Sequence, residues 1–77
     1  MEPLEAFAAN VKRLRKEQGL TQERLAEQAD LHLTDIARIE TLRRDPGVKV
    51  VAKLAHGLGC PTSALFEGVE AHPSELR

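Results

Sequence analysis

Arg38 carries the side chain with the most specific binding chemistry in this 77-residue chain. Its guanidinium could donate two parallel hydrogen bonds to guanine in a DNA major groove, a contact that discriminates between bases by roughly 1–3 kcal/mol. Leu33 and Thr34, about one turn earlier, could pack their methyl groups against the methyl group of thymine. Asp35 would repel phosphate, and we expect it to hold Arg38 in position rather than to accept a hydrogen bond from a cytosine amino group. The chemistry of this segment is therefore recognition of another molecule.

The chain offers no recognisable catalytic set. Its three histidines, His32, His56 and His72, are not spaced as metal ligands, and the single cysteine, Cys60, excludes an internal disulfide and a cysteine-based zinc site. No nucleophile is accompanied by a base and an orienting group, and there is no glycine-rich phosphate-binding loop. The sequence therefore predicts a protein that is not an enzyme and that binds no metal or cofactor.

The length and composition predict one small domain. Hydrophobic residues make up 42% of the chain, but tryptophan and tyrosine are absent, so aliphatic side chains must form most of the core. No apolar run approaches the roughly 18 residues of a membrane span, and charged residues interrupt the first twenty positions, unlike a signal peptide. We expect a soluble cytoplasmic protein, with a domain over residues 1–68 and a short tail over residues 69–77.

The charge is unevenly distributed along the chain, although the net charge is only −1. Residues 11–53 contain ten Lys or Arg and seven Asp or Glu, an excess of +3, and the remaining residues carry −4. A basic middle between acidic ends is compatible with nucleic-acid binding, but an excess of this size also occurs on ordinary solvated surfaces.

Apolar residues at helical spacing predict a compact all-α fold of five short helices, over residues 3–18, 22–29, from 32 or 33 to 41, 48–58 and 61–66. The first helix should end at Gly19, with Leu20 folding back over its end, and Thr21 should cap the second. We expect the buried face of the fourth helix to consist of Val48, Val51, Leu54, Ala55 and Leu58.

The second and third helices are joined by a turn too short for an ordinary loop. Leu25, Ala26 and Ala29 form the apolar face of one helix, and the small alanines allow a close approach to the next helix. The helix must stop within about a residue at Asp30, which favours a left-handed backbone conformation there. Two helices that cross steeply through such a turn can present the second helix to a DNA groove.

Five motifs in order along the chain closely resemble the Cro/repressor-type (XRE) helix-turn-helix family. They are Leu20–Ala26, Ile36–Glu40, Arg43–Pro46, Lys53–Ala55 and Leu58–Gly59, and the resemblance covers about residues 8–67. It implies a lambda-repressor-like domain that regulates transcription by binding a palindromic operator in double-stranded DNA as a homodimer. The helix around residues 32–41 would be the recognition helix.

The resemblance also implies roles for individual residues. The base-contacting positions are His32, Leu33, Thr34 and Arg38, with Asp35 beside them, and the phosphate-contacting positions are Thr21, Gln22, Arg43 and Arg44. Gln22 would also brace the recognition helix. Arg15 and Glu40 correspond to a partly buried structural ion pair that ties the first helix to the third.

Three residues depart from the family pattern. Asp30 replaces the usual turn glycine, His32 replaces the usual Ser or Thr cap of the third helix, and Leu42 stands where glycine commonly ends that helix. We therefore expect a weakened cap at His32 and an unusual helix exit at Leu42.

The fifth helix is the expected dimerisation surface, around Leu65, Phe66 and Val69, although Phe66 could instead belong to the core. The short chain is compatible with a phage-type repressor, a restriction–modification controller or the DNA-binding half of an antitoxin. A different class is a protein-interaction module of the same fold, such as an antitoxin that binds a toxin, and Leu33 would then contact the protein partner.

Overall fold

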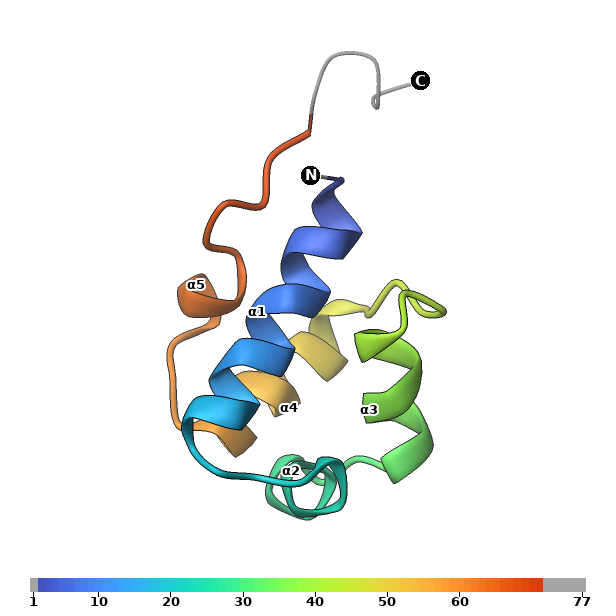
Figure 1. The fold of residues 1–77 in the computed structure, drawn as a ribbon, viewed down its shortest axis with the longest axis vertical. Coiled ribbons are helices and arrows are strands. Elements are labelled where there is room, and N and C mark those ends of the chain that lie inside the picture. The colour runs from blue at the N-terminus through green and yellow to red at the C-terminus, as the bar shows by residue number, and fades with distance from the viewer. Residues whose placement is uncertain (1, 72–77) are drawn as a thin grey trace.

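Five helices form the fold in the computed structural model, which describes residues 2–71 (Figure 1). They are α1 (Pro3–Glu17), α2 (Gln22–Ala29), α3 (Leu33–Glu40), α4 (Val48–Leu58) and α5 (Thr62–Leu65). There is no strand within these residues, and none of the helices is long and apolar enough to cross a membrane. The predicted all-α architecture of five helices is confirmed, with helix ends within two residues of those expected.

Each of the first four helices is followed, within two residues of its end, by a residue with a left-handed backbone. After α1 and α4 this residue is glycine, Gly19 or Gly59, but on either side of α3 it is Asp30 (φ 54°) and Leu42 (φ 64°). Each time, the next amide donates a hydrogen bond of 2.8–3.0 Å to the carbonyl five residues earlier, as in a Schellman motif. The left-handed turn predicted at Asp30 is confirmed, and Leu42 ends α3 in the same way.

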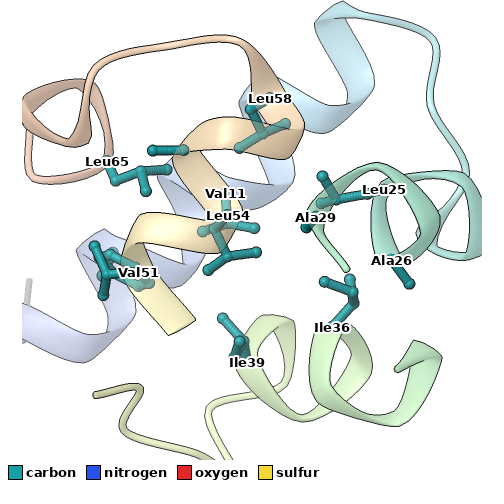
Figure 2. Packing of buried hydrophobic residues seen from close by; sticks show 12 residues of the cluster. Val11, Leu25, Ala26, Ala29, Ile36, Ile39, Val51, Leu54, Leu58 and Leu65 are labelled. Atoms are coloured by element: carbon teal, nitrogen blue, oxygen red, sulfur yellow. The ribbon is translucent and has the colours of Figure 1, made fainter. Parts of the chain in front are cut away.

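A single hydrophobic core lies where α1, α2, α3 and α4 meet, and α5 closes one side of it (Figure 2). Its fully buried large side chains are Val11, Leu25, Ile36, Ile39, Leu54 and Leu65. Val48 is the exception to the predicted face of α4, because as the first residue of that helix it lies beyond the core and is exposed to solvent.

The packing of α2 against α4 depends on Gly57. A Cβ atom at this position would lie 2.7 Å from the Cβ of Ala29, 2.8 Å from its amide nitrogen and 2.9 Å from its Cα. Real Cβ atoms essentially never come this close, so the two helices touch through their backbones. This contact fixes the end of α2 from which the turn to α3 departs.

Candidate nucleic-acid interface

Helix α3 has one face in the core and one face in solvent. Ile36 and Ile39 are fully buried, so the residues on the opposite side, Thr34 and Arg38, are exposed. Leu33, at the first position of the helix, keeps 43% of its surface exposed, and His32 before it is also exposed. The structure therefore brings all four predicted base-contacting residues to the accessible side or the N-terminal end of one helix.

The C-terminal end of α3 is held by a buried ion pair. The Nε and Nη2 atoms of Arg15 donate to the two carboxylate oxygens of Glu40 at 2.7 and 2.9 Å, and only 11% and 3% of the two side chains are exposed. Arg15 also donates to the carbonyl of Leu20 at 2.8 Å, and Gln22 donates to Glu40 at 3.2 Å. The predicted pair between α1 and α3 is present, and Gln22 braces the same carboxylate.

Burial opposes ionisation of Glu40, but hydrogen bonds from Arg15 and Gln22 outweigh it and hold the pKa of this carboxyl group below its ordinary value. The hydrogen bond to Glu40 likewise raises the pKa of Arg15. Both groups are therefore charged at neutral pH, and the end of α3 is fixed by a bidentate contact of two full charges.

The N-terminal end of α3 is held by Asp35, which does not pair with Arg38 as predicted. One oxygen of its carboxylate accepts from the backbone amide of His32 at 3.0 Å, and the other accepts from Nη1 of Arg44. Asp35 lies on the flank of α3, and the chain reversal at Leu42 brings the loop and Arg44 back along that flank. The hydrogen bond from His32, aided by Arg44, lowers the pKa of Asp35.

The four predicted phosphate-contacting residues differ in exposure and in their partners within the protein. Thr21 is exposed and its hydroxyl accepts from the amide of Arg24 at 3.0 Å, which confirms the predicted cap of α2. Gln22 is partly buried against Glu40, and Arg44 is partly buried against Asp35. Arg43 is exposed and makes no ion pair within residues 2–71.

Two residues near the candidate interface were not predicted from the sequence. Thr41 is exposed, three residues after Arg38 and seven after Thr34, and that helical spacing was the available signal. Its hydroxyl donates to the carbonyl of Ala37 at 2.7 Å. Lys53 of α4 donates to the carbonyl of Asp30 at 3.1 Å and so supports the turn, a contact between distant residues that left no local signal.

Comparison with known proteins assigns the fold to a family. The helix-turn-helix family model matches residues 11–65. The chain belongs to this family. It is 38% identical over 65 residues to the control protein C.MunI of Mycoplasma sp, an alignment that covers 83% of this chain and 88% of that protein. The predicted DNA-binding transcriptional regulator of the XRE type is confirmed at the level of the family.

Two solved structures of restriction–modification controller proteins are similar to this one. The restriction–modification controller C.AhdI from Aeromonas hydrophila is 30% identical, with a TM-score of 0.79, over 82% of this chain and 96% of that chain. The restriction–modification controller C.Esp1396I, solved as a tetramer in complex with its natural 35-base-pair operator, is also 30% identical, with a TM-score of 0.81, over 90% of this chain and 91% of that chain.

The residues predicted to form the dimer surface of this helix-turn-helix protein differ in exposure. Leu65 is wholly buried in the core of the protomer, so the prediction that its side chain contacts a partner is wrong. Phe66 is 45% exposed and also packs against Phe7, with ring centroids 5.3 Å apart. Phe66 and Val69 line an open groove of about 590 Å³, together with Val48 and other residues of α1 and α4.

Proposed function

We propose that this protein is the controller of a restriction–modification system and binds a palindromic operator as a homodimer through α3. The observation that carries this proposal is the exposed face of α3, a helix whose C-terminal end is anchored by a buried ion pair. The proteins similar to this chain include two such controllers and the control protein C.MunI. An anchored helix presents its side chains in one fixed orientation, which base readout in a groove requires. The protein would act in the cytoplasm and by binding alone, without catalysis.

Arg38 and Thr34 are the proposed base-reading side chains, with His32 and Leu33 at the end of the helix beside them. Thr21, Gln22 and Arg43 would contact phosphates on either side of the groove. Gln22 supports this division of roles because it joins the N-terminus of α2 to Glu40 of α3. A phosphate bound there would be positioned directly relative to the reading helix.

The proposed dimer would use the side of the molecule that carries α5, opposite α3 (Figure 1). Phe66 and Val69 would contribute apolar surface there. The molecule is 21 Å wide along its second axis, which is the direction from α3 to α5 in this view. Two protomers joined through α5 would place their α3 helices within about two such widths, a span that includes the roughly 34–36 Å between successive major grooves.

Selection of binding sites from random DNA tests the proposal. We expect enrichment of a palindrome, lost with Arg38→Ala, whereas Arg43→Ala should weaken binding evenly across sequences and reduce the log–log salt slope by about 0.9. Phe66→Glu should convert a sedimenting dimer into a folded monomer. Absence of enrichment at low salt would contradict the proposal and favour a protein-interaction module. A methyltransferase gene next to the coding sequence would support the controller role.

A further inference from the structure

We infer that Asp35 restrains DNA binding by holding Arg44, the second of two arginines that follow α3, in an intramolecular ion pair. This inference rests on the proposed function. Arg44 was expected to meet phosphate and Asp35 to meet a base or Arg38. The structure instead pairs them with each other, and each loses part of the role assigned to it from the sequence.

The Arg44–Asp35 pair lies where DNA could reach it. Both groups lie at the N-terminal turn of α3, the part of a recognition helix that enters the major groove. The side chains are 35% (Arg44) and 20% (Asp35) exposed, whereas the Arg15–Glu40 pair at the other end of α3 is almost completely buried. Only Nη1 of Arg44 has a hydrogen-bond partner within residues 2–71, so the other guanidinium donors are not committed to another group there.

The carboxylate of Asp35 reduces the net positive charge that Arg44 presents to DNA. An arginine that neutralises a phosphate releases a condensed counterion, which is the main source of sequence-independent affinity. Paired with Asp35, Arg44 forms a neutral unit, and its engagement with phosphate requires that the ion pair is weakened. Asp35 is not free to move away, because its other oxygen is fixed by the amide of His32. Asp35 therefore lowers affinity for all DNA sequences alike.

Asp35→Asn tests this inference, because asparagine keeps an oxygen that can accept from His32 but has no charge to hold Arg44. In titrations against operator and random DNA from 50 to 200 mM salt, we expect affinity at low salt to rise about two- to fivefold for both DNAs, the range of a partly exposed ion pair. The log–log salt slope should steepen by about 0.9, equivalent to a further loss of about threefold in affinity across this range. Base preference should stay the same.

Three control variants separate the inference from simpler explanations. Glu23→Gln removes the same charge from the exposed first turn of α2 without freeing an arginine, and should change the slope much less. Arg44→Ala combined with Asp35→Asn should abolish the gain, whereas Arg43→Ala in the same background should preserve it. A fall in affinity, an altered base preference or a gain that survives Arg44→Ala would each overturn the inference. If the unaltered protein binds no DNA in the same titration, the proposed function fails instead.

Discussion

The two carboxylates of α3 have similar partners and different surroundings. Glu40 and Asp35 each accept from an arginine outside the helix, Arg15 of α1 and Arg44 of the following loop. Glu40 is almost completely enclosed and receives a third hydrogen bond from Gln22, whereas Asp35 is partly open to solvent. A buried pair cannot exchange its partner without leaving a charge in the core, but a partly exposed pair can. One end of α3 is therefore suited to holding position and the other to responding to DNA.

The largest effect is expected from breaking the buried pair. Glu40→Ala or Arg15→Ala leaves the other charge buried without its partner and should lower the free energy of unfolding by about 3–5 kcal/mol. Urea denaturation followed by circular dichroism would measure this loss.

The double variant Arg15→Met with Glu40→Leu provides the matched control. Because it removes both charges and keeps apolar volume, it should recover most of the stability. A single-variant loss below about 1 kcal/mol would instead place this pair with ordinary surface ion pairs and remove its contrast with Asp35.

A smaller effect is expected from acid, which should reduce the stabilisation by Glu40 and by Asp35 over different pH ranges. Both pKa values are lowered in the folded protein, so each group stabilises the fold above its unfolded-state pKa, and this contribution is lost as pH falls through the folded-state pKa. The loss should begin below about pH 4.5 for Glu40 and below about pH 3.8 for Asp35, the ordinary pKa values of the two side chains.

Urea denaturation of Glu40→Gln and Asp35→Asn between pH 2.5 and pH 6 would measure this difference. Each substitution should flatten the acid dependence of stability in the range where its own carboxylate titrates, below about pH 4.5 for Glu40→Gln and below about pH 3.8 for Asp35→Asn. An unchanged acid dependence in either variant would show that the corresponding ion pair does not stabilise the folded protein.

The smallest effect concerns the left-handed residues at the two ends of α3. Asp30→Gly should stabilise the protein by about 0.5 kcal/mol, because glycine removes a left-handed strain of roughly 1–2 kcal/mol but adds chain entropy to the unfolded state. Leu42→Gly should stabilise the protein less, because it also removes a leucine side chain that is 43% exposed and covered over the rest of its surface. Melting temperatures of the two variants would measure the difference, and a larger gain at Leu42 would reverse this expectation.

Regular features of the fold could be predicted from the sequence because local physics determines them. Helical spacing identified the core positions Leu25, Ile36 and Leu54, and cap chemistry located the ends at Gly19 and Thr21. The prediction for Val48 was wrong because periodicity does not show where the core ends beyond the first turn of a helix.

The candidate site was predicted less completely, because its contacts join distant residues. Helical spacing suggested Arg38 as the partner of Asp35, but the reversal at Leu42 brought Arg44 closer. Leu65 was assigned to a partner surface because apolar residues near a chain end resemble an interface until the fold shows what covers them. The roles of individual residues in DNA contact remain predictions, and the variants above test them.

Gly57 constrains how this sequence can diverge. Most tight contacts in a core allow paired substitutions, in which a larger residue on one side is accommodated by a smaller one on the other. At Gly57 this route is closed, because two of the three obstructing atoms are the amide nitrogen and Cα of Ala29, which every amino acid has. We therefore expect the residues on the exposed face of α3 to change freely among descendants of this protein, while position 57 stays glycine in all that keep the same angle between α2 and α4.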